Sequence, residues 1–199
     1  MRKKNVSLLL LALGLLLFRC NLPVRTVTPT NAVRSEVTNR SQEAVKFKFL
    51  GTYPTLKDRM IVLYRYKRIL AKDTYPEKIL GYAAVDRHFW TGWQIGETSE
   101  GPSLSQDNPD RLVDFNLAYS LNRFTILYGE IITRKIVDIV AILDNGERLL
   151  AETDQEGFAF FAPRPVAPCE LQVLEANGDI LEKYEVYRYL EVPHHCQGK

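Results

Sequence analysis

The sequence of 199 residues is poor in the side chains that most often carry chemistry. It holds three histidines and three cysteines, and of the histidines only His88 lies inside the region that looks like a folded domain. No GxSxG, HExxH, CxxC, P-loop or GxGxxG pattern occurs. The missing motifs favour a protein without enzymatic activity, cofactor or metal. They leave open a carboxylate-based enzyme, because catalytic Asp and Glu can be far apart in sequence.

A strong charge of one sign is also lacking. The formal net charge is +2, but the first 20 residues contribute four basic side chains and no acid. The rest of the chain therefore carries a net charge of −2, with mixed signs. This balance gives no electrostatic footprint for nucleic acid, which we do not expect as a partner.

The main hydrophobic run is too short to cross a bilayer comfortably. The stretch Val6–Phe18 spans about 20 Å as a helix, against a hydrocarbon core of about 30 Å. Basic residues precede it, and its length is typical of the apolar region of a signal peptide. We therefore expect residues 1–20 to be a signal peptide and the protein to be exported.

The end of this run resembles a bacterial lipoprotein signal peptide. In that family a short box precedes a cysteine that receives lipid, and Leu17 and Cys20 of "LLLFRC" stand at the matching positions. Arg19 departs from the pattern, which has a small residue there. The resemblance implies lipidation of Cys20 and anchoring at a membrane of the cell envelope. The alternative is an ordinary signal segment, with the protein secreted or held by the segment itself.

The remaining sequence predicts a mainly β protein with an antiparallel, β-sandwich-like fold. Residues 21–42 are rich in Thr, Asn, Ser and Pro and predict a flexible tether. Short runs rich in Val, Ile, Tyr and Phe then predict strands. We expect a β subdomain at 43–95, a polar loop or linker at 96–110, a β-sandwich-like subdomain at 111–192 and a tail at 193–199. Residues 108–119 fit either a short helical entry followed by a strand or a strand alone.

Two turns are well marked. Asn145-Gly146 and Asn177-Gly178 each separate apolar runs, which predicts type I′ hairpins between antiparallel neighbours. A further pattern in the region 129–187 consists of Gly129, Val140, Thr153, Asp154, Gly157 and Phe158. With these positions the region is similar to a carboxypeptidase-regulatory-like, or transthyretin-like, module. The resemblance implies a non-catalytic β-sandwich on an exported protein and transfers no active site.

One aromatic cluster is a candidate ligand site. In "HFWTGWQIG", a two-residue turn at Thr91-Gly92 would place Trp90 and Trp93 on opposite strands. With Tyr82 nearby, they predict an exposed platform for a sugar or a partner peptide. The alternative is a cross-strand pair lying over the core.

The remaining cysteines and acids have simpler interpretations. If Cys20 is lipidated or removed, Cys169 and Cys196 form an even pair, and export permits a disulfide between them. No metal site is expected at His194, His195 and Cys196, because chain ends usually fray. The acids Asp107, Asp110 and Asp114 lack the spacing of a calcium loop and predict a solvated acidic loop.

These observations favour an exported protein and leave three hypotheses for its function. The first is a membrane-anchored, non-enzymatic β-domain protein that acts through protein or glycan contacts. The second is a periplasmic or secreted hydrolase with an unrecognised carboxylate site. The third is an accessory subunit of an envelope complex, for which an open edge strand or an uncovered apolar patch would be evidence.

Overall fold

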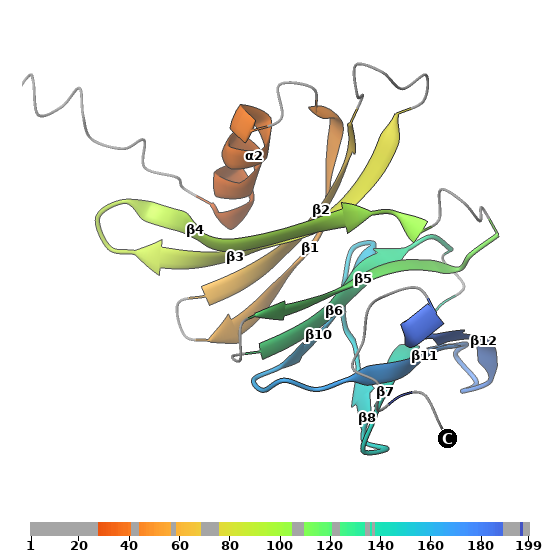
Figure 1. Cartoon of the computed structure of the whole chain (residues 1–199). Helices are drawn as coiled ribbons and strands as arrows, with labels where there is room; N and C mark the ends of the chain where they lie inside the picture. Colours follow the sequence, from red (N-terminus) through yellow and green to blue (C-terminus); the bar gives the residue numbers. More distant parts are fainter. Residues whose placement is uncertain are drawn as a thin grey trace, which may run out of the picture.

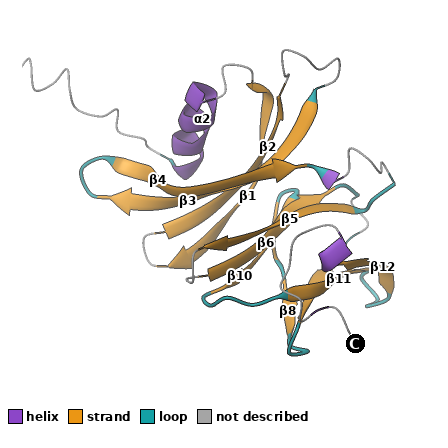
Figure 2. Ribbon diagram, viewed as in Figure 1, coloured by secondary structure: helices purple, strands orange, loops and turns teal. Residues whose placement is uncertain are grey.

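The computed structural model describes residues 28–40, 44–56, 59–68, 76–104, 110–120, 124–133, 136, 138–188 and 196. Within these ranges the chain is mainly β, with one α-helix and three antiparallel sheets of four strands each (Figure 1, Figure 2). The fold class expected from the sequence is confirmed. No helix in the described part of the chain has the length and apolar character needed to cross a bilayer.

The first sheet is a meander of consecutive strands. They are β1 (Ala44–Leu56), β2 (Arg59–Arg68), β3 (Glu77–His88) and β4 (Gly92–Pro102), in the order β1-β2-β3-β4. Residues 96–102, expected in a loop or linker, are the second half of β4, so that expectation is wrong for them. Their Gly, Ser and Glu content hides the strand because β4 is a half-exposed edge strand.

Helix α2 (Pro29–Arg40) lies on the outer face of this sheet (Figure 1). Thr28 caps it, since its Oγ1 accepts a hydrogen bond from the N–H of Asn31 at 3.2 Å, and Pro29 suits the first helical position. Val33 and Val37 lie one turn apart and are buried against the sheet. The flexible tether predicted for 21–42 is therefore wrong for residues 29–40. Packing on the sheet stabilises a short polar helix that local sequence does not reveal.

The second and third sheets are built from interleaved strands. The second contains β5 (Val113–Ser120), β6 (Phe124–Ile131), β10 (Gly157–Ala162) and β9 (Glu152–Asp154), in the order β5-β6-β10-β9. The third contains β12 (Ile180–Glu185), β11 (Pro168–Leu174), β7 (Asp138–Leu143) and β8 (Arg148–Leu150), in the order β12-β11-β7-β8. The 3-10 turn η2 (Val186–Arg188) follows β12. Of the two interpretations of 108–119, the structure has the strand from Val113 onward.

The helix and the three sheets form successive layers, with a hydrophobic core between each layer and the next. The helix packs on the first sheet, and the other face of that sheet packs on the second sheet through Leu63, Tyr82, Ile126 and Tyr128, among others. The opposite face of the second sheet packs on the third through Phe115, Phe158, Leu171 and Val173, among others. Strand β6 is buried along nearly its whole length because it has a core on each side. The N-terminal and C-terminal halves therefore share a core.

The two Asn-Gly hairpins join antiparallel neighbours as expected, but their turn type differs from the prediction. Gly146 and Gly178 have φ of +83° and +86°, whereas Asn145 and Asn177 are not among the described residues with positive φ. A type I′ turn needs positive φ at both central residues. The N–H of Gly146 bonds to the carbonyl of Leu143 at 2.9 Å, as in a three-residue loop with a left-handed glycine. The side chain of Asn145 stabilises the turn, because its Oδ1 accepts a hydrogen bond from the N–H of Glu147 at 2.8 Å.

Candidate binding groove and hairpin tip

The loop between β3 and β4 presents two exposed aromatic rings. His88 pairs with Gly92 across the hairpin, so the loop consists of Phe89, Trp90 and Thr91. Phe89 is 81% exposed and Trp90 84% exposed. Their ring centroids lie 4.9 Å apart with an interplanar angle of 88°. We call these two residues the hairpin tip.

The expected pairing of Trp90 with Trp93 is wrong. Trp93 lies opposite Arg87 in the β3–β4 ladder, while Trp90 belongs to the loop. The cause is Gly92, whose φ of +77° closes a three-residue loop where a two-residue turn was expected. Trp93 is partly buried and packs against the core beneath α2.

Tyr82 is not part of an exposed platform. Its side chain is fully buried between the first and second sheets, with its ring centroid 5.2 Å from that of Tyr128. Its hydroxyl donates to Glu97 Oε1 at 3.1 Å, and burial is the main cause that raises its pKa. The alternation of Leu80, Tyr82 and Ala84 on one face of β3 is the sequence signal that could have placed it in the core. Of the three predicted ligand residues, only Trp90 is well exposed.

A groove of about 370 Å³ runs between α2 and β4. One wall comes from the α2 residues Ala32, Ser35, Glu36 and Arg40, whose spacing places them on one helix face. The other wall comes from Thr91 and every residue from Trp93 to Thr98. Consecutive strand residues point to opposite faces of a sheet, so a cavity lined by all of them lies along the strand edge. Since β4 ends the sheet order, this edge has no neighbouring strand among the described residues.

The groove combines an aromatic ring with charged and hydrogen-bonding groups. Arg40 Nε donates to Glu36 Oε1 at 2.5 Å, and Arg40 Nη1 lies 3.4 Å from Thr98 Oγ1. The guanidinium therefore bridges α2 and β4. Trp93 contributes an indole to the lining, beside the amide side chain of Gln94. These groups suit binding, and they contain no nucleophile with an adjacent base.

A β-bulge interrupts β4 at Gly96. Ala84 pairs with Glu97 and Val85 with Ile95, so Gly96 is the extra residue. A Cβ atom at Gly96 would lie 2.7 Å from Asp86 Oδ2, a carboxylate fixed by two hydrogen bonds from Arg59 at 2.7 and 3.0 Å. The hydrogen bond from Arg59 is the main cause that lowers the pKa of Asp86. Glycine is therefore needed at the bulge, where the backbone of β4 comes close to Asp86.

The strongest alternative for an active site is a pair of buried acids. Asp114 and Glu130 lie at facing positions of β5 and β6 and are 0% and 3% exposed. Lys78 Nζ lies 3.5 Å from Asp114 Oδ2 and 3.0 Å from Glu130 Oε2. Arg65 Nη1 lies 2.7 Å from Glu130 Oε1. The two cations belong to the first sheet and the two acids to the second, so the cluster joins the sheets.

The remaining lone pairs of Asp114 also have partners. Ser103 Oγ donates to Oδ2, and the N–H of Leu104 donates to Oδ1 at 2.9 Å. The solvated acidic loop expected around Asp114 is therefore wrong for this residue, whereas Asp110 is exposed. Asp107 lies outside the described residues. A carboxylate with this many protein partners and no exposure is typical of a structural ion pair.

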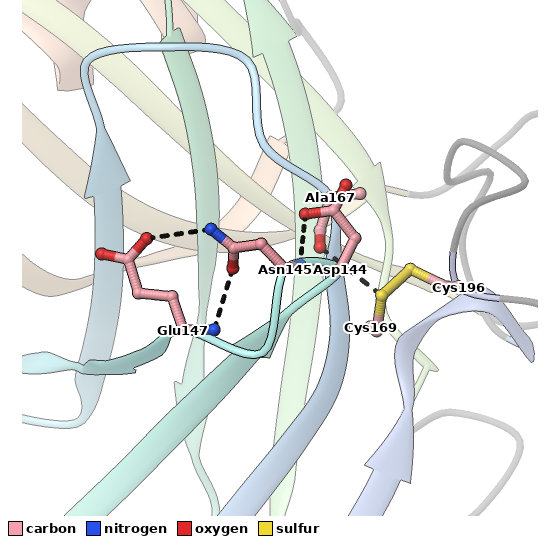
Figure 3. The surroundings of a disulfide bond; sticks show 6 residues. All are labelled: Asp144, Asn145, Glu147, Ala167, Cys169 and Cys196. Atoms are coloured by element: carbon pink, nitrogen blue, oxygen red, sulfur yellow. Dashed lines mark hydrogen bonds between the residues drawn. A yellow bond between two sulfur atoms is a disulfide. The ribbon is translucent and has the colours of Figure 1, made fainter. Parts of the chain in front are cut away.

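Cys169 and Cys196 are joined by a disulfide with a Cα–Cα distance of 5.2 Å (Figure 3). The bond connects residue 196 to β11 at the start of that strand. Figure 3 shows the neighbouring β7–β8 turn, where the N–H of Asp144 donates to the carbonyl of Ala167 at 2.9 Å. Cys20, His194 and His195 lie outside the described residues. In the described part of the chain, no three His, Cys, Asp or Glu side chains form a metal-binding group.

No family model, curated protein or solved structure matches the chain. The residues of the transthyretin-like pattern lie in the sandwich of the second and third sheets: Gly129 in β6, Val140 in β7, and Asp154 and Phe158 in β9 and β10. A Cβ atom at Gly129 would lie 2.3 Å from Cε1 of Phe158, so this glycine permits the close packing of the Phe158 ring.

Proposed function

We propose that this chain is an exported, membrane-anchored protein without enzymatic activity, which holds a short extended segment of a partner protein in the groove between α2 and β4. The observation that carries the proposal is the pairing of a helix wall with an open strand edge. Extended peptides commonly bind by adding a strand to such an edge, and side-chain pockets beside the edge supply specificity.

The composition of the groove supports a peptide ligand. The backbone groups of β4 on its open edge offer donors and acceptors, while Trp93 offers apolar area. Arg40, Glu36 and Glu97 offer charges of both signs for the partner's side chains. The bulge at Gly96 interrupts the edge, so it suits a short segment and hinders association of whole sheets.

A glycan is the second candidate ligand for the same groove. Binding pockets commonly combine an aromatic side chain with a few polar groups that fix orientation, and Trp93 lies here beside Gln94 and Glu97. A glycan would not need the backbone edge of β4. This difference separates the two ligands in an experiment.

The proposed absence of enzymatic activity is supported by the burial and ion pairing of the acidic side chains between the first and second sheets. Asp114 and Glu130 are buried and ion-paired with Lys78 and Arg65, which suits cohesion of the sheets. His88 is exposed at the end of β3 and is not among the residues that line the groove. Membrane anchoring is supported by the apolar run and by the position of Cys20 after it.

The test uses the protein in the membrane fraction of its native host. A photo-crosslinking side chain at Gln94 is expected to trap one discrete protein species, and Ser35→Arg, which fills the groove from the helix side, is expected to abolish the product. The matched control places the crosslinker at Asp179, in an exposed turn of the third sheet. Intact mass of the same sample reports the anchor, with a chain that begins at Cys20 and carries acyl mass.

Three outcomes would each contradict one part of the proposal. Equal crosslinking from Gln94 and Asp179 would remove the groove as the binding site. A crosslink from Gln94 to a glycan, which survives proteolysis and is lost after glycosidase treatment, would replace the peptide by the second candidate. An unmodified, soluble mature chain would overturn the anchor without affecting the groove.

A further inference from the structure

The hairpin tip and the start of α2 lie at the same end of the groove. Ala32, in the first turn of α2, and Thr91, the last residue of the loop, both line it. At the other end, the guanidinium of Arg40 reaches Thr98, six positions beyond Gly92 along β4. Figure 1 shows α2 beginning beside the β3–β4 hairpin. The chain therefore enters the fold at the end of the groove that Thr91, the neighbour of Trp90 in the loop, also lines.

The connection to the proposed anchor is short. Seven residues, 21–27, separate Cys20 from Thr28. Even a fully extended chain of this length spans only about 28 Å. If Cys20 or the run before it is held in a bilayer, the end of the domain that carries the hairpin tip stays close to that bilayer.

The charges at this end suit a membrane surface. No Asp or Glu precedes Glu36 in the sequence, and none occurs from Arg87 to Gly96 in the hairpin. Arg34 on α2 and Arg87 on β3 are both exposed. Basic side chains are attracted to anionic headgroups, and Trp is enriched at the interface between bilayer and water.

We infer that Phe89 and Trp90 dock the domain on the lipid surface, as a second contact beside the N-terminal anchor. This inference rests on the anchoring part of the proposed function. Neither ring supports a core, since both are more than four-fifths exposed. Insertion of the two rings at the headgroup level fixes the orientation of the domain, with the groove beginning next to the membrane surface.

The experiment uses the full chain, as processed by its native host, in vesicles of phosphatidylcholine with about one quarter phosphatidylglycerol. The protein has two tryptophans, Trp90 and Trp93. Trp93→Phe leaves Trp90 as the only reporter, and Trp90→Phe is the matched control that leaves Trp93. Lipids with brominated acyl chains quench indoles in contact with the bilayer.

Brominated lipid is expected to lower the emission of Trp90 by about twofold or more, and to leave the emission of partly buried Trp93 unchanged. If Trp93→Phe fails to fold, the quenching of Trp90 is obtained as the difference between the wild-type and Trp90→Phe signals. Replacing the anionic lipid by phosphatidylcholine is expected to weaken the quenching of Trp90.

Two results would overturn the inference, and flotation distinguishes them. If the protein floats with the vesicles but Trp90 is quenched by aqueous iodide and not by brominated lipid, the tip is not a membrane contact and the anchor stands. If the protein does not float with the vesicles, the anchor fails, and the inference that rests on it fails as well.

Discussion

Ionisation of buried tyrosines is expected to set the alkaline limit of this fold. Besides Tyr66, five tyrosine side chains are at most 4% exposed: Tyr53, Tyr64, Tyr82, Tyr128 and Tyr184. Burial is the largest cause that raises the pKa of each one above its ordinary value. Carboxylates that accept the hydroxyl hydrogen bonds of Tyr64 and Tyr82 raise these two pKa values further.

The sign and size of the effect follow from proton linkage. A tyrosine in the unfolded chain loses its proton near pH 10, whereas the folded protein keeps these five hydroxyls protonated to higher pH. Their contribution to stability is therefore complete below about pH 10 and is lost as pH rises toward the folded pKa values. Each group lowers the free energy of unfolding by about 1.4 kcal/mol per pH unit in this window, and five together by about 7 kcal/mol. Because the total is commonly about 5–15 kcal/mol, unfolding is expected within about two units above pH 10.

Urea unfolding followed by circular dichroism between about pH 8 and pH 11.5 measures this slope, and tyrosinate absorbance at about 295 nm shows when the hydroxyls ionise. Tyr64→Phe removes one of the five hydroxyls and is expected to reduce the slope by about 1.4 kcal/mol per pH unit. A free energy of unfolding that stays constant above about pH 10 would refute the reasoning, as would tyrosinate formation by all ten tyrosines in a protein with a native spectrum.

Three substitutions test other parts of the fold by the same urea assay. Glu130→Gln removes the carboxylate that Arg65 and Lys78 share, and only Lys78 keeps an acidic partner, Asp114. The expected cost is about 3 kcal/mol, and a loss below about 1 kcal/mol would contradict the role of the cluster. Cys169→Ser opens a link across 27 residues and is expected to cost about 3.5 kcal/mol, matched by reduction of the wild type. Gly129→Ala places a Cβ atom 2.2 Å from the carbonyl of Asp114 and 2.3 Å from the ring of Phe158, and is expected to cost about 3 kcal/mol; an unchanged midpoint would refute that packing.

The sequence was sufficient for the fold class because strand signals are local. Runs of apolar and aromatic residues bounded by turn formers mark most strands of the three sheets, and Gly146 and Gly178 mark two hairpins. The half-exposed edge of β4 was missed, since its residues need no apolar alternation. Helix α2 was missed because its stability comes from Val33 and Val37 packing on a sheet that is distant in sequence.

The candidate site was harder to predict for a related reason. Its groove exists only because α2 and β4, which are about 60 residues apart, lie side by side. The exposure of Trp90 was one of two interpretations of the sequence, and neither foresaw that Gly92, with its positive φ, would take Trp90 out of register with Trp93. Asp114 was placed in solvent because nothing local indicates its partners Lys78 and Ser103, which come from other parts of the chain.

The central position of the second sheet has a consequence for how the chain acquires its structure. The strands of the first sheet are consecutive, so their pairing needs only residues 44–102. The inner face of that sheet stays open until β6 and β10 arrive, and β10 follows β7 and β8, which belong to the third sheet. Contacts between segments distant in sequence form slowly, and exposed apolar faces are prone to aggregation in the meantime. A chain that emerges from its N-terminus would therefore have a first sheet early and an unburied apolar surface until nearly its last strands appear, which is the period when it most needs a chaperone.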